Sequence, residues 1–477
     1  MKTISKILIF VSMSLALSGC DDFLTKEPET NLSPNTFFSS EAELELWTNR
    51  FYSLFAGPDT DAIQVSDIQI AKNLSSVQQG TRSPATENWG TSAWAYLRYI
   101  NYYLERSGNC PDETIRQRYD GVAYFFRALF YFEKVRKYGD IPYYDFVIPA
   151  NDWASLKRPR DRRGFVMKKV MEDLDRAITD LPDNWPSDAL YRLSKNAARA
   201  MKARAALYEG TFRKYHSREP SSDKPWQNDV YNADNKFLRE AAAAAKEIMD
   251  KGPFSLVTGD VKTAYRSLFT SAGLLTQEVI FGREYSKELS AFHETSWYYY
   301  SPTYGTKIAM TKKFMNTYLT TKGTPFTDID GYKTIDFIHE FDGRDARMAQ
   351  TVISPSYQMK ISGRTVPYSP NWKVTRTGYH PIKWSIDDDA DNVLSKAASW
   401  NSLPIIRYAE VLLNYAEAKA ELGEMDAAVW DQTIAPLRSR AGVTSVIPAK
   451  ADPYMEAYFL NTVTDKWILE VRRERGI

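Results

Sequence analysis

The sequence has few of the residues that build disulfide frameworks, metal sites and common catalytic centres. It holds two cysteines and four histidines among 477 residues. Two cysteines are too few for a disulfide framework. His293 opens a His-Glu-Thr-Ser-Trp segment, but Trp297 stands where an HExxH zinc motif needs its second histidine. Nucleophile-elbow, phosphate-loop and dinucleotide motifs are missing as well. We therefore expect neither an enzyme nor a cofactor, and no metal site.

An excess of charge of one sign is also missing, since 61 basic residues balance 60 acidic ones. Nucleic-acid binding needs a basic face that neutralises phosphates, so this balance argues against such a partner. The only basic run, 158–163, is interpreted as a solvated loop entering a helix. After Cys20 no run of 18 or more apolar residues occurs, so no later segment predicts a membrane-spanning helix.

The first residues predict a signal peptide over 1–19. Lys2 and Lys6 precede an apolar run too short to span a bilayer, and Leu-Ser-Gly-Cys follows at 17–20. That tetrapeptide resembles a bacterial lipobox, which implies that Cys20 is lipidated and anchors the chain to a membrane. Asp21 and Asp22 resemble the surface-export signal of Bacteroidetes lipoproteins. With Cys20 lipidated, Cys110 is expected to be a free, buried thiol.

The remaining chain divides into four parts by its composition and hydrophobic pattern. Residues 20–40 are polar and contain prolines, which favours an extended tether. Residues 41–253 form the predicted N-terminal helical part, opened by a capping box of Ser40 and Glu43. Its amphipathic helices are expected at about 41–55, 92–106, 114–137, 194–213 and 235–251.

Residues 254–403 are rich in turn-forming and aromatic residues and are predicted to form loops, short strands and a few helices. We assign ligand binding to this region. Helical periodicity returns at 404–477, with a helix predicted over 404–422 and a second from about 426, in which Pro436 implies a break or kink. Helix pairs with small contacts and short turns indicate tetratricopeptide-like packing.

Several blocks resemble one family closely. They are the mature start at 20–38, AYFFRALFYFEKVRKYGDIPYY at 123–144, MEDLDRAITDLP at 171–182, SKNAARAMKARAALYEG at 194–210, LPIIRYAEVLLNYAEAKAELG at 403–423 and LRSRAGV at 437–443. The chain is identified from them as a member of the SusD/RagB family. The resemblance implies a mainly helical fold of tetratricopeptide-like helix pairs with a loop-rich insertion. It also implies a lipoprotein on the outer membrane, facing the cell exterior, that delivers oligosaccharides to a SusC-like TonB-dependent transporter.

The blocks that resemble the family have a structural interpretation. Arg127, Tyr131 and the turn at 137–144 are expected to fix one helix pair on the next. The closing block of the family would extend beyond residue 477, so the C-terminal part is expected to be truncated. Specificity is then expected in the unmatched loop-rich region.

Aromatic side chains provide the predicted ligand site. The sequence has 30 Tyr, 23 Phe and 12 Trp, and Trp297, Tyr298, Tyr299 and Tyr300 are consecutive, with Tyr304 close behind. Flanking Ser, Thr, Pro and Gly favour an extended surface loop whose rings alternate between two faces. Flat aromatic rings suit the apolar face of a sugar. Trp89 and Trp372, in turn-rich segments, are further ligand-binding candidates, and each could equally be a core aromatic that fixes its loop.

One acidic turn could hold a cation. Residues 387–392 read DDDADN, which places oxygen ligands at alternate positions but lacks the glycine and the distant glutamate of an EF-hand loop. A solvated turn is the preferred interpretation.

Three other functions remain open at this point. The protein could be a peptide-capturing lid of the same type of transporter, a surface glycosidase, or a helical-repeat scaffold without a small ligand. The scaffold hypothesis predicts that the aromatic segment is buried.

Overall fold

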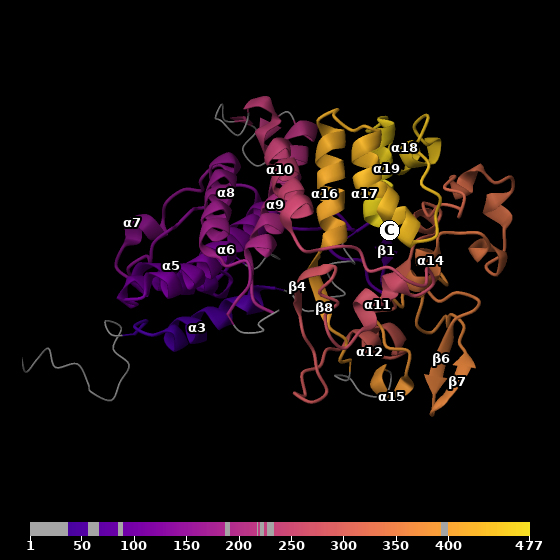
Figure 1. Cartoon of the computed structure of the whole chain (residues 1–477), viewed down its shortest axis with the longest axis horizontal. Helices are drawn as coiled ribbons and strands as arrows, with labels where there is room; N and C mark the ends of the chain where they lie inside the picture. Colours follow the sequence, from indigo (N-terminus) through magenta and orange to yellow (C-terminus); the bar gives the residue numbers. More distant parts are fainter. Residues whose placement is uncertain are drawn as a thin grey trace, which may run out of the picture.

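The computed structural model describes residues 37–55, 66–83, 89–186, 191–216, 218–219, 224–226, 233–392 and 399–477 (Figure 1). Cys20 and its lipobox lie outside the described residues. The last residues of the predicted tether belong to the folded part of the chain. Phe38 is fully buried, and its ring packs edge-on against Trp47 with centroids 5.2 Å apart.

The N-terminal part is helical, as predicted. The capping box is present: the Glu43 carboxylate accepts the Ser40 N–H at 3.2 Å and the Ser39 N–H at 2.7 Å. The helices are α3 (Glu41–Asn49), η1 (Arg50–Leu54), η3 (Thr91–Trp94), α5 (Ala95–Arg106), η4 (Ser107–Asn109), α6 (Glu113–Tyr138), α7 (Trp153–Leu156), α8 (Arg163–Asp180), α9 (Lys195–Tyr215), η5 (Ala233–Asn235) and α10 (Lys236–Lys251). Cys110 is buried and forms no disulfide, as expected.

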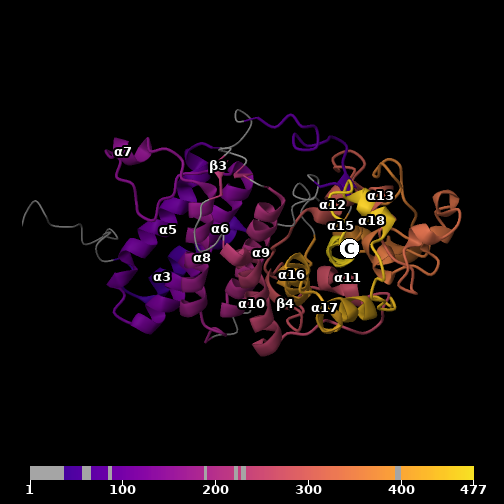
Figure 2. The same cartoon turned by 90° about the horizontal axis from the view of Figure 1, so that it is seen from above.

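Helices α6, α8, α9 and α10 pack side by side in chain order, and α16 (Tyr408–Glu421) follows α10 (Figure 2). This serial packing of neighbouring helices confirms the predicted mainly helical, tetratricopeptide-like class. Small residues allow the close approach, because a Cβ on Gly210 would lie 2.8 Å from the Leu238 side chain.

Two polar contacts hold α6 in place, one to α8 and one to the segment that follows α6. The guanidinium of Arg127 on α6 donates two hydrogen bonds to Asp173 on α8, at 2.8 and 2.6 Å, with both side chains buried. The Tyr131 hydroxyl donates to the Tyr144 carbonyl at 2.9 Å and accepts the Tyr144 N–H at 2.6 Å. These contacts confirm the structural role predicted for the 123–144 block.

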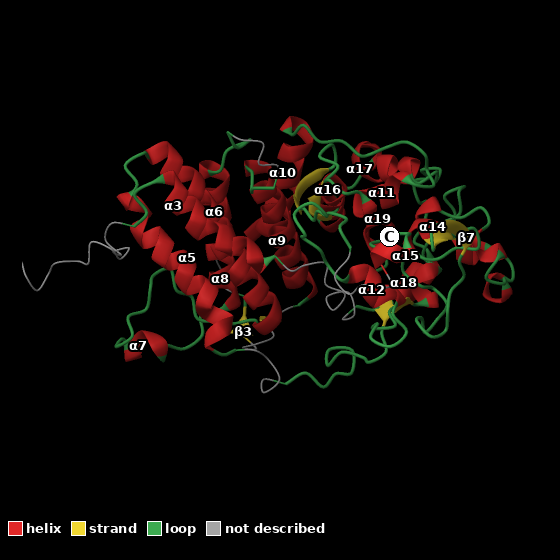
Figure 3. Ribbon diagram, turned by 90° about the horizontal axis from the view of Figure 1, so that it is seen from below, coloured by secondary structure: helices red, strands yellow, loops and turns green. Residues whose placement is uncertain are grey.

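The region 254–403 contains short elements between long loops (Figure 3). They are α11 (Ala264–Thr270), β4 (Val279–Arg283), α12 (Thr295–Tyr300), β5 (Ala309–Met310), α13 (Lys312–Met315), η6 (Phe326–Asp328), η7 (Tyr332–Thr334), η8 (His339–Phe341), α14 (Ala346–Thr351), β6 (Gln358–Ile361), β7 (Arg364–Pro367) and α15 (Asp389–Asn392). Strands β6 and β7 form a hairpin through Ser362 and Gly363, both at positive φ.

Two further strands pair with segments that are distant in the sequence. β1 (Gln69–Ile70) pairs antiparallel with β5, and β8 (Leu403–Arg407) pairs antiparallel with β4. The short strands β2 (Arg218–Glu219) and β3 (Lys224–Pro225) pair with each other. The helix predicted over 404–422 is therefore wrong in its first residues, because the backbone of 403–407 pairs with β4 before α16 begins.

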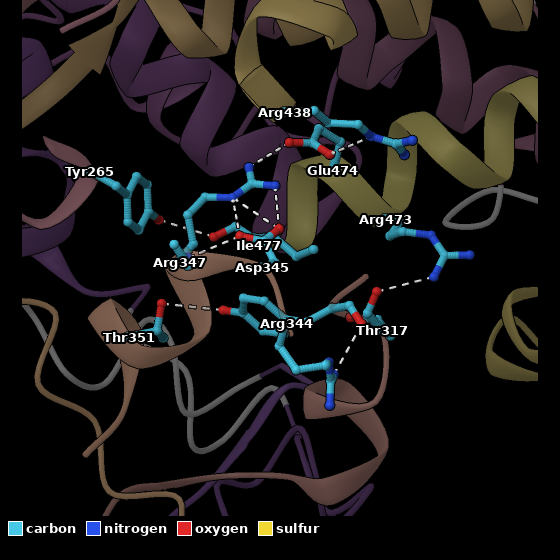
Figure 4. A network of polar contacts seen from close by, with 12 residues as sticks. Tyr265, Thr317, Arg344, Asp345, Arg347, Thr351, Arg438, Arg473, Glu474 and Ile477 are labelled. Carbon is cyan, nitrogen blue, oxygen red and sulfur yellow. Dashed lines mark hydrogen bonds and ion pairs between the residues drawn. The ribbon is translucent and has the colours of Figure 1, made fainter. Parts of the chain in front are cut away.

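The C-terminal part comprises α16, α17 (Ala427–Arg440), α18 (Pro453–Tyr458) and α19 (Lys466–Gly476). Helix α17 runs through Pro436, so the predicted break is absent. Figure 4 shows a buried ionic network beside α19: Arg347 pairs with Asp345 at 2.7 Å and with Glu474, which also pairs with Arg438. This network ties the loop-rich region to α17 and α19.

Candidate functional site

The aromatic segment at 297–300 is a short helix, α12, and the extended conformation predicted for it is wrong. Because helical side chains do not alternate between two faces, the four rings fall differently from the prediction. Tyr299 and Tyr300 are 4% and 2% exposed and belong to a buried cluster with Ile353, Met359 and others. Burial raises the pKa of Tyr300 to about 12. We refer to the buried rings of Tyr299 and Tyr300 as the floor of the candidate site.

Backbone and side-chain hydrogen bonds fix the start of α12. The Thr295 N–H donates to Nδ1 of buried His293 at 3.3 Å, and the Ser296 N–H donates to Oγ of Ser399 at 3.3 Å. The other ring nitrogen of His293, Nε2, lies 3.1 Å from the Asn401 carbonyl. Burial lowers the pKa of His293 to about 4, which keeps its ring neutral and able to accept the Thr295 N–H.

A polar chain anchors the floor from below. The Tyr300 hydroxyl lies 2.9 Å from the Tyr357 hydroxyl, which donates to Asp387. Asp387 in turn receives two hydrogen bonds from the Arg266 guanidinium. The segment that carries the aromatic rings is thus held by a rigid network.

The surface above this floor carries Trp297, Tyr298 and Tyr304. Trp297 and Tyr298 are half-buried and pack edge to face, with centroids 5.0 Å apart. Tyr304 is 71% exposed, and its ring stacks on Trp297 at 5.6 Å with an interplanar angle of 18°. The tertiary structure therefore brings together three of the predicted residues. We refer to Trp297, Tyr298 and Tyr304 as the aromatic platform.

A tight turn after α12 places Tyr304. The Ser301 hydroxyl accepts the Tyr304 N–H at 3.1 Å, and the Gly305 N–H donates to the Ser301 carbonyl at 3.0 Å. A Cβ on Gly305 would lie 2.3 Å from that carbonyl oxygen and 2.6 Å from the Tyr298 carbonyl oxygen. Only glycine fits this position without moving the backbone. Composition pointed to a turn here, but not to Gly305 itself.

A segment that the sequence analysis did not single out runs beside the platform. In the strap 66–83, the Lys72 N–H donates to the Thr306 carbonyl at 2.7 Å, next to Tyr304. Ten residues later, the Arg82 guanidinium donates to the Lys137 carbonyl at the end of α6. The strap follows one edge of the molecule from the loop-rich half to the helical half (Figure 2). No motif in the sequence marks this pairing.

The other two predicted residues lie apart from the platform contacts. Trp89 is half-buried in the helical half, where its ring packs edge-on against Trp94 at 5.1 Å and Tyr138 at 4.7 Å. Trp372 is 72% exposed, and a Cβ on Gly378 would lie 3.7 Å from its ring. Trp89 therefore also fits the alternative interpretation, an aromatic that fixes its own loop.

The described carboxylates of the acidic turn are engaged within the protein. Asp387 pairs with Arg266, Asp388 with Lys360 at 2.8 Å, and Asp389 accepts the Ser362 N–H. Across the described ranges, no three His, Cys, Asp or Glu side chains gather in a way that could hold a metal ion. The turn is a structural joint between α11, α15 and the β6–β7 hairpin.

Two family models match this chain and between them cover most of it. The one described as "SusD family" matches residues 277–477, and the one described as "Starch-binding associating with outer membrane" matches residues 22–207. Their spans include α6, α8, the first part of α9, α16 and the platform. The chain belongs to the SusD/RagB family.

Curated SusD-like relatives match parts of the chain. SusD-like protein P2 of Formosa agariphila is 27% identical over 225 residues, which are 43% of this chain and 44% of that protein. SusD-like protein P25 of the same organism is 23% identical over 300 residues, 56% of each chain. The matches thus span about half the length of these relatives.

Solved SusD-like structures share the fold over nearly the whole chain. A SusD-like protein of Bacteroides fragilis superposes with a TM-score of 0.69 at 22% identity, covering 94% of this chain and 89% of its own. A SusD-like carbohydrate-binding protein of the same species gives 0.69 at 21%, covering 92% and 84%. At such identities the likeness establishes the fold. Among the described helices of this SusD-family chain, none has the length and apolar character needed to cross a membrane.

Proposed function

We propose that this SusD-family protein binds oligosaccharides at the aromatic platform and takes part in glycan uptake. The observation that carries the proposal is the stacked pair of Trp297 and Tyr304, in which Tyr304 is largely exposed above a buried, hydrogen-bonded floor. A sugar ring has an apolar C–H face that packs on a flat aromatic ring, and the tyrosine hydroxyl adds a polar contact. Similarity to a SusD-like carbohydrate-binding protein supports this cargo.

The site favours a binding protein over the other functions. The scaffold hypothesis predicts that the aromatic segment is buried, and Tyr304 does not fit it. A glycosidase needs two carboxyl groups facing the scissile bond. Two acids close to α12, Asp387 and Asp388, are instead paired with Arg266 and Lys360. A peptide cargo remains the alternative, and it is an outcome of the test below.

The proposal extends to location and partner. Lipidation of Cys20 would anchor the protein to the outer membrane with its body facing the exterior. A SusC-like TonB-dependent transporter would then receive the captured oligosaccharide. The family description that mentions association with the outer membrane supports this arrangement.

The experiment compares wild-type protein and a Trp297→Ala/Tyr304→Ala variant in binding to a panel of oligosaccharides and peptides by isothermal titration calorimetry. We expect saturable binding of at least one glycan by the wild type and loss of that binding in the variant. Trp153→Ala is a matched control, because it removes another exposed ring, on α7 and outside the platform. Circular dichroism establishes that each variant is folded.

Other outcomes separate the hypotheses. Peptide binding without glycan binding would show that the cargo is a peptide. Turnover of a polysaccharide by the pure protein would favour the glycosidase hypothesis. Unchanged glycan binding in the double variant would refute the platform as the site. Mild-detergent extraction of the lipidated protein from its own outer membrane, followed by mass spectrometry, tests the transporter, and we expect a stoichiometric TonB-dependent barrel.

A further inference from the structure

A second concave site lies in the helical half of the molecule, between the start of α5 and the segment 142–156. It is a cavity of about 550 Å³. Two half-buried tryptophans, Trp89 and Trp94, line it, and their rings pack edge to face at 5.1 Å. Figure 1 places α7, at the end of this segment, at the far end of the molecule from α12. This cavity is distinct from the aromatic platform.

The lining of the cavity is mainly apolar. Besides the two tryptophans it includes Phe146, Ile148 and Leu156. Asn101 also reaches it, but its amide already donates to the carbonyls of Tyr144 and Phe146. A plain sugar carries hydroxyl groups around its ring, and many of them would be buried here without hydrogen-bond partners, which is costly. The ligand that fits has an apolar ring.

One cation lines the cavity, and two more lie against its tryptophan rings. Arg98 lines it and uses one of its N–H groups on the Ile148 carbonyl at 3.0 Å. The guanidinium of Arg160 lies 5.1 Å from the Trp89 ring centroid, and the Lys134 ammonium lies 5.4 Å from that of Trp94. Within the described residues, none of these three cations forms an ion pair with a carboxylate.

Three acids lie close to the cavity in sequence. Asp145 is exposed between the lining residues Tyr144 and Phe146, and the other two accept backbone N–H groups. Glu105 accepts the Val147 N–H at 2.6 Å, and Asp152 accepts the Ser155 N–H at 3.0 Å to cap α7. Burial lowers the pKa of Lys134, as expected for a cation beside aromatic rings without an acid partner. Arg98 is the only charged residue among those that line this mainly apolar cavity.

We propose that this cavity binds an aryl carboxylate, with the aromatic ring against Trp89 and Trp94 and the carboxylate on Arg98. A guanidinium presents paired N–H donors that match a carboxylate, and such charge-assisted hydrogen bonds are stronger than neutral ones. Burial of the aromatic ring against the apolar walls stabilises the complex, and Arg98 favours a ligand with negative charge. This inference does not depend on glycan binding at the platform.

The test is calorimetric titration of the full-length protein with benzoate and 4-hydroxycinnamate, and with benzamide and glucuronate as the neutral and polar comparisons. We expect one-to-one binding of the aryl carboxylates. Benzamide should bind about tenfold or more weakly because it lacks the charge that strengthens a hydrogen bond to Arg98. Glucuronate should also bind about tenfold or more weakly, because its hydroxyl groups would be buried without partners. Arg98→Gln should weaken benzoate by a similar factor. Arg118→Gln, the same change on an exposed stretch of α6, should leave it unchanged.

A second variant separates the site from the fold. Ala150 lines the cavity and is exposed, so Ala150→Phe can fill the space without entering the core, and it should abolish binding. The platform variant Trp297→Ala/Tyr304→Ala should bind benzoate as the wild type does, which keeps this test independent of the glycan test. The inference is overturned by absence of saturable binding to the wild type, by benzamide or glucuronate binding as tightly as benzoate, or by binding that neither Arg98→Gln nor Ala150→Phe alters.

Discussion

The ring of Tyr304 lies stacked on that of Trp297, with centroids 5.6 Å apart and planes inclined by 18°. Trp297 is held within α12, while Tyr304 projects from the turn that follows it. The helix therefore supplies a fixed backing ring, and the turn supplies the exposed one.

The first prediction separates the ring of Tyr304 from its hydroxyl. Tyr304→Ala removes the exposed platform surface and should weaken glycan binding about tenfold, the equivalent of about 1.4 kcal/mol. Tyr304→Phe keeps the ring and should weaken binding less. Calorimetric titration of both variants gives the comparison. Equal losses in the two variants would mean that the hydroxyl, and not the stacking surface, carries the contact.

The second prediction concerns Gly305. A Cβ there would meet the Ser301 and Tyr298 carbonyl oxygens at 2.3 and 2.6 Å, so Gly305→Ala must shift the turn. We expect weaker glycan binding and a loss of stability of about 1–3 kcal/mol, measured by denaturant unfolding. Gly273→Ala is a suitable control, because a Cβ at Gly273 has nothing within 4 Å. A Gly305→Ala variant with wild-type binding and stability would contradict the assigned role.

The third prediction concerns the buried pair of Arg127 and Asp173 between α6 and α8. Arg127→Ala leaves the Asp173 carboxylate buried without its partner and should cost about 3–5 kcal/mol of unfolding free energy. Arg127→Met with Asp173→Leu removes both charges and should recover much of that loss. Urea unfolding of the single and double variants measures both effects. A double variant as unstable as the single one would show that packing, and not the unpaired charge, dominates.

The fourth prediction is a loss of stability in mild acid. Burial lowers the pKa of His293 and of His380 from 6.5 to about 4. Between these values the unfolded chain binds protons that the folded chain does not, so stability is complete above pH 6.5 and falls as pH falls toward 4. Each histidine contributes at most about 3 kcal/mol to this loss.

His380 provides the means to check it. Its ring is fully buried against Tyr300, with centroids 4.9 Å apart. His380→Phe keeps an aromatic ring but removes the titrating group, so the variant should lose less stability than the wild type between pH 6.5 and 4. Thermal unfolding across this range gives the comparison. Parallel profiles for the two proteins would show that His380 does not titrate differently on folding.

Much of the fold could be predicted from local sequence, because the helices of the stack carry strong 3.6-residue periodicity and clear capping signals such as Ser40 and Glu43. One error occurred where a distant segment competes with local preference. Residues 403–407 follow a helical pattern but pair with β4, and this pairing cannot be read from the residues nearby. The break predicted at Pro436 was also wrong, because α17 continues through it.

The candidate site shows the same difference between what the local sequence predicts and what the tertiary structure decides. Sequence alone determined that residues 297–304 hold an unusual concentration of aromatic rings in a turn-rich region, and that the chain has a SusD/RagB scaffold. Only the tertiary structure decided that Tyr299 and Tyr300 are buried while Tyr304 is exposed, because burial depends on contacts with Tyr357, Ile353 and Met359, which are more than 50 positions away. The cavity of Trp89, Trp94 and Arg98 likewise exists only because the segment 142–156 folds back against α5.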